Sequence, residues 1–352
     1  MPVDFLIIGS GLTGATIARI LHDAGNRVLV VDRREHPGGN VHDHVQNGIR
    51  VHTYGPHYFR TNSERIWQFV NRFADWYRYE PCLLTDVDGQ LERWPIPTSK
   101  LPIGWQPEFQ GEPKTFEDAC LAMMPADIYH RYVKGYTEKQ WGKPANQLAP
   151  ELAGRFHVAP DDDPRLMAHR HQGLPVDGYA AFTAQLLDGI PLELGVDGLK
   201  EQPPHRHMIF TGPIDEYHGY RYGKLEYRAQ SRIHRWHAER QQPCGQVNNP
   251  GAGAHVRTLE WVHMMSPAEQ TRISGSVTTT ETPRTPDDPN AYEYPVPDTR
   301  NRRLFQRYKQ IPTPDVTICG RLGEYRYYDM DQAIGRAMRI ASRLMRMSEV
   351  AA

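Results

Sequence analysis

The sequence has 352 residues, and its 41 Lys and Arg nearly balance its 42 Asp and Glu, which gives a formal net charge of −1. A chain of this length can bury a sizeable core in two or three compact units, and its balanced charge gives no reason to expect nucleic acid or an anionic membrane as a partner. The longest apolar run is far shorter than a bilayer span, and the cysteines and histidines show no metal-ligand spacing. We therefore expect a cytoplasmic protein with reduced thiols, no membrane span and no metal site.

The first forty residues predict a strand, a glycine turn, a helix and a second strand. The two strands and the helical stretch cover Phe5–Ile8, Arg27–Val31 and Ala15–Leu21. In a dinucleotide-binding turn Gly9 makes the tight bend, Gly11 lets the backbone approach a pyrophosphate, and Gly14 allows close helix packing. Asp32 ends the second strand, where an acid accepts a hydrogen bond from a ribose hydroxyl. A glycine turn that only packs would leave Asp32 unexplained, so the pattern predicts dinucleotide binding.

A second glycine pair, Gly38-Gly39-Asn40, follows Asp32. A nicotinamide domain has no particular need for this pair. In many flavoproteins, an acidic residue followed by a second Gly-Gly turn lets the backbone lie against the ribose and pyrophosphate of FAD. The pattern therefore favours FAD over NAD, and the alternative is an ordinary surface turn.

The middle of the chain interrupts the nucleotide-binding pattern. An N-cap and apolar residues at helical spacing predict a helix over 62–75, and Asp88-Gly89 between apolar flanks predicts a hairpin over Leu83–Trp94. The other expected segments are a linker over 95–113, helices over 115–141 and 147–156, a break at Asp161–Pro164, a strand at Ile209–Gly212 and strand-like segments over 224–296.

The C-terminal region carries a second signal of nucleotide binding. The apolar strand Val316–Gly320 is followed by a glycine-containing turn and by a helix from about Asp331 to Met347. This arrangement can bring helix N-terminal amides to the edge of a flavin, with Arg321 against the pyrophosphate and Asp331 as a helix cap. The alternative is a surface turn with an arginine and a group of tyrosines.

Together these motifs resemble the UDP-galactopyranose mutase family. The matching segments run along nearly the whole chain and comprise Gly9–Gly14, Gly38–Asn40, Val51–Phe59, Lys134–Gly142, Gln172–Pro175, Thr211–Asp215, Gly223–Arg228, Tyr294–Pro295 and Gly320–Asp331. The resemblance implies an α/β fold in which a small helical domain and an antiparallel β-sheet domain interrupt a Rossmann-like FAD-binding domain.

The expected domain boundaries follow from the same resemblance. The FAD-binding domain comprises 1–80, 201–223 and 306–352, the β-sheet domain 81–94 and 224–305, the helical substrate domain with a mobile loop 95–170, and a β-sheet or linker region 171–200.

The resemblance also implies a reaction. Members of this family interconvert pyranose and furanose forms of a sugar nucleotide without net redox change, yet they require reduced FAD. The flavin N5 displaces the nucleotide diphosphate from the anomeric carbon, and a flavin–sugar iminium allows the ring to open and close differently. The default reaction is UDP-galactopyranose to UDP-galactofuranose. An external reductant such as NAD(P)H and a possible homodimer are further expectations.

The substrate diphosphate needs cations. By the resemblance, Arg155 lies on the loop that closes over the diphosphate, and Arg257 and Arg284 match other substrate-facing arginines. Arginine suits this task because its planar fork binds phosphate oxygens bidentately and stays charged. Without the resemblance, Arg155 would be interpreted as a solvated residue at a helix end.

The nucleobase is expected at Tyr132, Tyr136, Thr137 and Trp141. Tyr132 and Tyr136 are four residues apart on one helical face, so a base can stack on one ring while Thr137 supplies a hydrogen bond. The alternative is an aromatic stripe that belongs to the core.

Other roles are carried over residue by residue. Tyr294, Tyr325 and Tyr327 resemble tyrosines of the phosphate and sugar pocket. His57 resembles a histidine against the flavin, with a role in proton transfer or simple packing. The candidate catalytic residues are Arg155, Arg257, Arg284, His57, Tyr294 and Tyr327. The remaining candidate flavin contacts are Gly9, Gly11, Leu12, Thr13, Gly14, Asp32, Arg33, Gly39, Asn40, Arg321, Tyr328, Asp329 and Met330.

The chain departs from the pattern of bacterial mutases at three positions. Arg60 replaces a second histidine, Leu166 replaces a tyrosine that reaches the diphosphate, and Pro81 replaces an asparagine near the base. These changes leave open the same chemistry on another nucleotide sugar, such as a deoxyhexose. An FAD-dependent oxidase or dehydrogenase of the same fold, or a flavin-binding homologue without catalysis, are the remaining alternatives.

Overall fold

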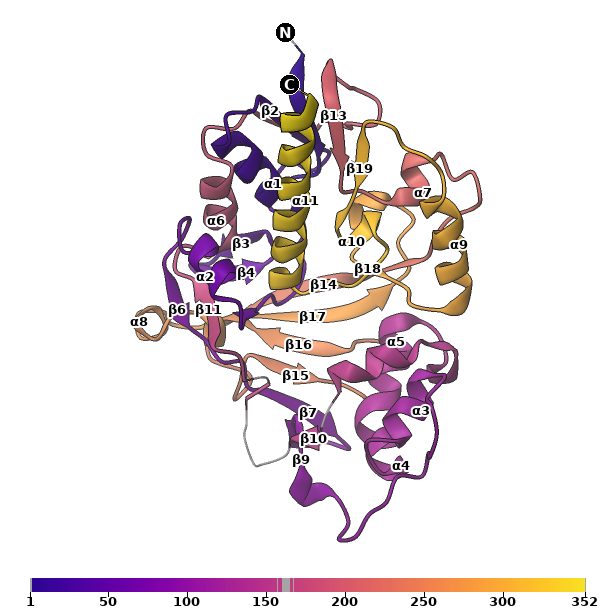
Figure 1. Ribbon diagram of the computed structural model, residues 1–352. Coiled ribbons are helices and arrows are strands. Elements are labelled where there is room, and N and C mark those ends of the chain that lie inside the picture. The colour runs from indigo at the N-terminus through magenta and orange to yellow at the C-terminus, as the bar shows by residue number, and fades with distance from the viewer. Residues whose placement is uncertain (1, 157, 160–164, 167, 352) are drawn as a thin grey trace.

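The computed structural model describes residues 2–156, 158–159, 165–166 and 168–351. The upper part of Figure 1 holds a parallel sheet with the strand order β12-β2-β1-β13-β19. In that order the strands span Leu192–Leu194, Val28–Asp32, Val3–Ile8, His205–Phe210 and Val316–Ile318. The sheet joins distant parts of the chain because β13 pairs with β1 on one side and with β19 on the other.

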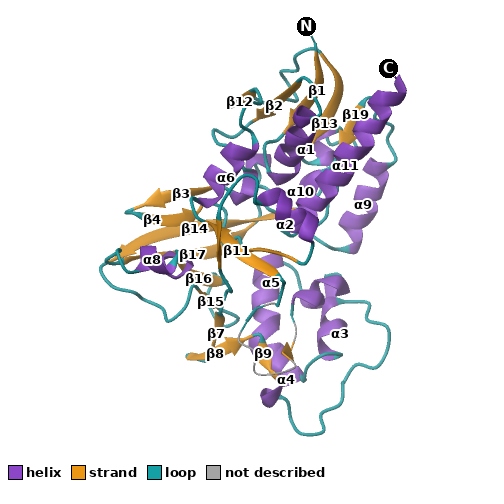
Figure 2. Ribbon diagram, turned by 60° about the vertical axis from the view of Figure 1, so that its left-hand side comes forward, coloured by secondary structure: helices purple, strands orange, loops and turns teal. Residues whose placement is uncertain are grey.

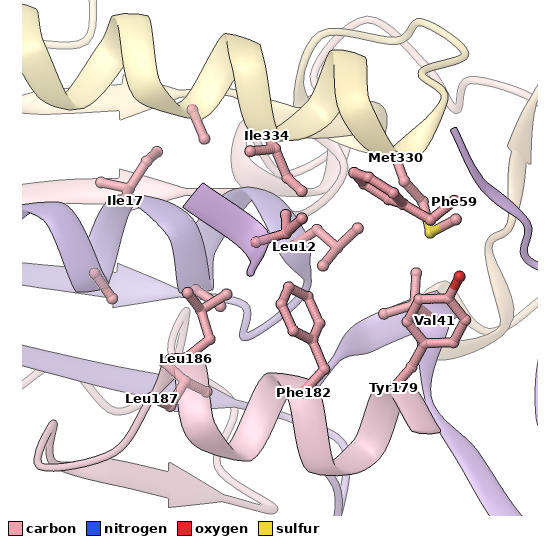
Figure 3. Close-up of a cluster of buried hydrophobic side chains, with 14 of the residues drawn as sticks. Leu12, Ile17, Val41, Phe59, Tyr179, Phe182, Leu186, Leu187, Met330 and Ile334 are labelled. Atoms are coloured by element: carbon pink, nitrogen blue, oxygen red, sulfur yellow. The ribbon is translucent and has the colours of Figure 1, made fainter. Parts of the chain in front are cut away.

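Both faces of this parallel sheet are covered, which explains why its strands are apolar runs. One core contains Ile7 of β1 and side chains of the helices α1 (Leu12–Asp23), α6 (Gly178–Leu186) and α11 (Met330–Ala351). Figure 3 shows Leu12, Phe182 and Ile334 of these helices converging on it. Leu6 and Ile8, which alternate with Ile7, belong to a separate core on the other face.

A second sheet lies below the first, with the strand order β18-β14-β17-β16-β15-β7-β8 (Figure 1). The strands span Tyr294–Pro295, Tyr227–His237, Ser276–Arg284, Arg257–Glu260, Gln246–Asn248, Leu83–Val87 and Gln90–Trp94. Neighbours are antiparallel except β15 and β7, which run parallel. The hairpin of β7 and β8 confirms the prediction, and its turn residues Asp88 and Gly89 both have positive φ.

Helical segments gather beside β7 and β8, away from the parallel sheet (Figure 2). They are α3 (Phe116–Leu121), α4 (Ala126–Ile128), the π-helical η3 (Tyr129–Lys134) and α5 (Gly135–Trp141). A capping box between Thr115 and Asp118 starts α3, and Gly142 ends α5 in the left-handed conformation.

Short elements complete the described chain. The small sheets pair β3 (Asp43–Gln46) with β4 (Ile49–His52), β11 (His171–Pro175) with β5 (Phe59–Thr61) and β6 (Trp76–Arg78), and β9 (Ile96–Pro97) with β10 (Val158–Ala159). The other α-helices are α2 (Glu64–Val70), α7 (Ile214–Tyr217), α8 (Pro267–Gln270), α9 (Thr299–Lys309) and α10 (Gly320–Gly323). The 3-10 segments are Gly39–Val41, Thr98–Lys100, Ala145–Gln147, Pro150–Arg155, Trp261–Met264 and Pro289–Ala291.

Some expected boundaries are wrong. The helix expected over 62–75 ends at Val70, and the chain continues through a turn into β6. The helix expected over 147–156 is replaced by two 3-10 segments, since Pro150 lacks an N–H and starts a new turn. Asp331 is the second residue of α11 rather than its cap. The break expected at Asp161–Pro164 lies outside the described residues.

Candidate functional site

A cavity of about 1080 Å³, including space open to solvent, lies at the carboxyl ends of β1 and β2. Gly9 has a φ of 103°, which favours glycine in the turn after β1. A Cβ atom on Gly14 would lie 1.9 Å from the Gly9 carbonyl oxygen, so α1 can approach the turn only with glycine there. A Cβ atom on Gly39 would lie 2.9 Å from the Gly11 Cα. The wall of this cavity is therefore closely packed backbone, as a dinucleotide-binding turn requires.

Asp32 lies at the edge of the same cavity and also holds the turn in place. Its Oδ2 accepts hydrogen bonds from the backbone N and the Oγ of Ser10, at 2.7 and 2.6 Å. Its Oδ1 accepts from the backbone N of Arg34 at 3.0 Å. The carboxylate is buried. Its orientation is thus set by the glycine turn before any ligand arrives.

Most of the candidate flavin-binding residues line this dinucleotide cavity. They are Gly9, Gly11, Leu12, Thr13, Gly14, Asp32, Arg33, Gly39, Asn40, His57, Arg321, Tyr328 and Met330. Asp329 instead lines the neighbouring cleft. The guanidinium of Arg33 forms two hydrogen bonds with Glu216 of α7, at 2.9 and 3.0 Å.

The segment after β19 closes one side of the cavity. Gly320 begins α10 with a φ of 83°. The guanidinium of Arg321 donates to the backbone oxygens of Glu293, at 3.2 Å, and Tyr328, at 2.9 Å. Arg321 therefore has a fixed position between the dinucleotide cavity and the cleft, both of which it lines.

The cleft, of about 1710 Å³ including open space, meets the dinucleotide cavity at His57, Arg321 and Met330. Its other cations come from Arg60, Arg155 and Arg257. The guanidinium carbon of Arg155 lies 4.5 Å from the centre of the Tyr327 ring, and that of Arg321 lies 4.9 Å from the same ring. Tyr294 stacks beside Tyr327, with ring centres 6.4 Å apart. The cleft therefore presents guanidinium groups and phenols to a single space.

A buried ion-pair network holds Arg257 at the cleft. Its Nε donates to Glu281 Oε2 at 2.5 Å, and Arg232 Nε donates to the other oxygen of Glu281 at 2.7 Å. Arg232 also forms two hydrogen bonds with Glu293, at 2.8 and 2.7 Å. Burial acts to raise the pKa of Glu281, but the two arginines outweigh it and lower that pKa. Glu281 thus stays ionised and orients Arg257 through its Nε.

The other end of the cleft is aromatic and apolar. Tyr132 lies on the π-helical segment and Tyr136 on α5, and both line the cleft with Thr137, Trp141 and Trp94. A π-helical segment inside an α-helix often marks a functional site. The hydroxyl of Thr137 is buried, with no partner among the described residues. It is available to a ligand that reaches this end.

His57 stands where the two spaces meet. Its Nδ1 lies 2.7 Å from the carbonyl oxygen of Gly55, so Nδ1 carries the proton and Nε2 is the acceptor. Its backbone N donates to Nδ1 of His52 at 3.1 Å. Burial, aided by the positive charge of Arg321, lowers the pKa of His57 to about 3. His57 is therefore neutral at pH 7.

Comparison with known proteins connects this geometry to a family. A family model described as UDP-galactopyranose mutase matches residues 131–327, and one described as NAD(P)-binding Rossmann-like domain matches residues 7–73. The probable UDP-galactopyranose mutase of Klebsiella pneumoniae is 30% identical over 97% of this chain and 94% of its own length. The chain belongs to the UDP-galactopyranose mutase family.

Further similar proteins include a mutase named for a different sugar nucleotide and a solved structure. The dTDP-fucopyranose mutase of Escherichia coli is 31% identical over 96% of this chain and 97% of its own length. A crystal structure of reduced UDP-galactopyranose mutase superposes with a TM-score of 0.78 at 14% identity, over 98% of this chain and 96% of that one. The chain is thus a pyranose/furanose mutase homologue, in a family of isomerases, with a Rossmann-like dinucleotide-binding domain.

The departures from the family pattern lie in or beside the cleft. Arg60 Nη2 lies 3.3 Å from Asp329 Oδ2, and both residues line the cleft. The backbone N of Leu166 donates to the backbone oxygen of Pro81 at 3.2 Å, so these two departures contact each other. Arg60 and Leu166 thus line the cleft, and Pro81 contacts Leu166 beside it.

The structure does not bring Arg284 to the cleft. It ends β17, is exposed, and lines neither the cleft nor the dinucleotide cavity. Glu281 lies three residues earlier on the same strand and faces Arg257. Because side chains alternate along a strand, a residue three positions away points to the opposite face.

Several site residues were missed by the analysis of the sequence. Ser10 and Arg34 contact Asp32, while Tyr58, Gln246 and Asn248 line the cleft. The weak signal available was the polar pair Gln246 and Asn248, two residues apart in a short strand and therefore on one face. In the described part of the chain, no group of His, Cys, Asp and Glu is arranged to hold a metal, and no helix is long and apolar enough to cross a bilayer.

Proposed function

We propose that this chain binds FAD and interconverts the pyranose and furanose forms of a nucleotide sugar, with UDP-galactose as the default substrate. One observation carries the proposal: a dinucleotide cavity opens at His57, Arg321 and Met330 into a cleft lined by guanidinium groups. Membership of the mutase family supports the reaction class.

The residues of the dinucleotide cavity fit FAD. Side chains at Gly9, Gly14 and Gly39 would clash with neighbouring atoms, which leaves exposed backbone along the path of a pyrophosphate. Asp32 is oriented to accept from a ribose hydroxyl, and Arg321 adds a positive charge where the two spaces meet. When bound in its reduced form, FAD supplies a nucleophilic nitrogen for the anomeric carbon of the sugar.

The protein's own task is to bind and neutralise the diphosphate that leaves the sugar. Arg155 and Arg257 are placed to bind its oxygens, and Tyr294 and Tyr327 can donate hydrogen bonds from their hydroxyls. Glu281 engages Nε of Arg257, so the terminal nitrogens stay available for phosphate. Held cations of this kind stabilise the charge that develops on the leaving group as its bond to carbon breaks.

The aromatic end of the cleft would receive the nucleobase. Tyr132, Tyr136 and Trp141 offer ring faces, and the unpaired hydroxyl of Thr137 offers a hydrogen bond. Neutral His57 would lie against the flavin, with Nε2 able to accept a hydrogen bond from a sugar hydroxyl. An external reductant such as NAD(P)H and a homodimer complete the proposal as predictions.

Anaerobic product analysis tests this function. The flavin-loaded protein, oxidised or reduced with dithionite, would be incubated with UDP-galactofuranose and separately with dTDP-fucofuranose. We expect UDP-galactopyranose from the reduced sample alone. Conversion of dTDP-fucofuranose alone would replace the default substrate. Reduction of the oxidised flavin by either sugar, without isomerisation, would favour an oxidoreductase, and no turnover of either sugar would contradict the mutase.

A further inference from the structure

The floor of the cleft is a series of neighbouring strands that present different groups in order. Arg257 comes from β16, Asn248 from β15, Leu83 from β7 and Trp94 from β8, and all of them line the cleft. Asn248 pairs directly with Arg257, and Leu83 pairs directly with Trp94. Adjacent strands lie about 4.8 Å apart. The floor thus runs from a cation, through an amide, to an apolar and aromatic end.

A nucleoside diphosphate has its parts in a matching order: diphosphate, pentose and base. If the proposed function is correct, it lies along this floor. A diphosphate on Arg257 and a base near Trp94 place the pentose over β15. The polar side chains of β15 at this level are Gln246 and Asn248. They are two residues apart and share a face of the strand. Both ends of the Gln246 amide are engaged in hydrogen bonds, to Tyr58 and to Asn248. Asn248 is therefore the side chain left to meet the pentose.

The orientation of the Asn248 amide is set by a chain of hydrogen bonds. The Tyr58 hydroxyl donates to Gln246 Oε1 at 3.2 Å, and Gln246 Nε2 donates to Asn248 Oδ1 at 2.8 Å. Gln246 is 4% exposed and Asn248 is 8% exposed, so neither amide turns freely. Because Oδ1 of Asn248 faces the Gln246 amide, the NH₂ group of Asn248 is the end that is left to face the cleft. An amide NH₂ group can only donate hydrogen bonds.

We propose that Tyr58 and Gln246 are positioning residues that fix Asn248 as a hydrogen-bond donor to a ribose hydroxyl, and that they make the site selective for ribonucleotide substrates. A pentose that lacks this hydroxyl leaves a buried amide unpaired, which lowers affinity. The site thereby favours UDP-sugars over sugars carried on deoxyribonucleotides. This inference depends on the proposed function for the placement of the nucleotide.

Binding of free nucleotides separates this inference from the catalytic proposal. Calorimetry would compare UDP with 2′-deoxy-UDP and 3′-deoxy-UDP on the flavin-loaded protein. We expect at least one deoxy analogue to bind at least about fivefold more weakly than UDP. A change in Kd of this size corresponds to the loss of one hydrogen bond. Equal affinity for all three would overturn the inference and leave the mutase proposal intact. Failure of UDP itself to bind would contradict the proposed function.

Tyr58→Phe tests the positioning role. This variant should bind UDP more weakly. The difference in affinity between UDP and the more weakly bound deoxy analogue should shrink to within about twofold, because the two amides lose the hydrogen bond that orients them. The control is Tyr79→Phe, whose ring stacks on Tyr58 at 5.8 Å but does not line the cleft. This control should keep the full difference. A Tyr58→Phe protein that still discriminates fully would overturn the inference.

Asn248→Leu provides a second test if Tyr58→Phe folds poorly. Leucine has a size similar to that of asparagine but can neither donate nor accept a hydrogen bond. Discrimination between UDP and its deoxy analogue should fall as in Tyr58→Phe. Full discrimination in Asn248→Leu would contradict a donor role for Asn248.

Discussion

The dinucleotide cavity and the cleft are built in different ways. The cavity is shaped mainly by backbone, where added Cβ atoms at Gly14 and Gly39 would clash with neighbouring backbone. The cleft is shaped by long side chains, and the buried carboxylate of Glu281 holds Arg257 in position. The first kind of site depends on the backbone of its turns, and the second depends on side-chain contacts between neighbouring strands. The two should therefore respond to different mutations.

Removal of the carboxylate behind the cleft is expected to have the largest effect. Glu281→Gln leaves Arg232 and Arg257 buried with one fewer negative charge, which should lower the free energy of unfolding by about 3–5 kcal/mol. Urea unfolding would measure this. Glu151→Gln is the control, because its partner Arg302 is 49% exposed and Glu151 is 68% exposed, so the loss there should stay below about 1 kcal/mol. Similar losses in both variants would contradict the structural importance of the network.

Arg155→Ala should damage catalysis while leaving the fold intact. In the described residues Arg155 contacts Tyr327 rather than a carboxylate, so little stability is at stake. Loss of one cation on the leaving diphosphate should reduce kcat/KM by about 10²–10³-fold. Steady-state kinetics of the reduced enzyme would test this, with Arg155→Lys as the conservative control that retains part of the activity. Unchanged kinetics in Arg155→Ala would remove Arg155 from the substrate site.

Acidification should destabilise the fold through three histidines whose pKa values are lowered by burial. Burial lowers the pKa of His52 and His57 to about 3 and that of His42 to about 4. In the unfolded chain these histidines take up protons near pH 6.5, whereas in the folded protein they remain neutral. Their contribution to the free energy of unfolding is therefore complete above that pH and is lost as the pH falls toward 4. Each histidine contributes a slope of up to about 1.4 kcal/mol per pH unit. Urea unfolding from pH 7 to pH 4 would measure the decline, and His42→Asn should make it shallower. An unchanged slope would contradict this origin.

The smallest effect is expected at Arg284. Its exposed position at the end of β17 places it outside both spaces, so Arg284→Ala should change kcat/KM by less than about twofold. The same assay as for Arg155 would measure it. A loss comparable to that of Arg155→Ala would show that Arg284 reaches the substrate after all.

These differences explain what the sequence could predict. The turn at Gly9–Gly14, the hairpin at Asp88-Gly89 and the apolar strands are encoded by nearby residues, and the structure confirms them. Arg155 and Arg257 were found only through resemblance to a family, because a charged residue alone does not reveal its neighbours. The position of Arg284 outside the cleft could not be predicted, because the sequence does not show the register of a strand. The chain of hydrogen bonds from Tyr58 to Asn248 could not be predicted, because Tyr58 and Gln246 are 188 positions apart in the sequence.

The central claim is that one region holds the cofactor and the other binds the substrate. Bound flavin and turnover should be measured in the same samples of the wild type, Asp32→Ala and Arg155→Ala. We predict that Asp32→Ala loses flavin and regains turnover when FAD is added in excess. Arg155→Ala should keep its flavin, and its low turnover should not recover with added FAD. Loss of flavin in Arg155→Ala, or full flavin content in Asp32→Ala, would contradict this division of the site.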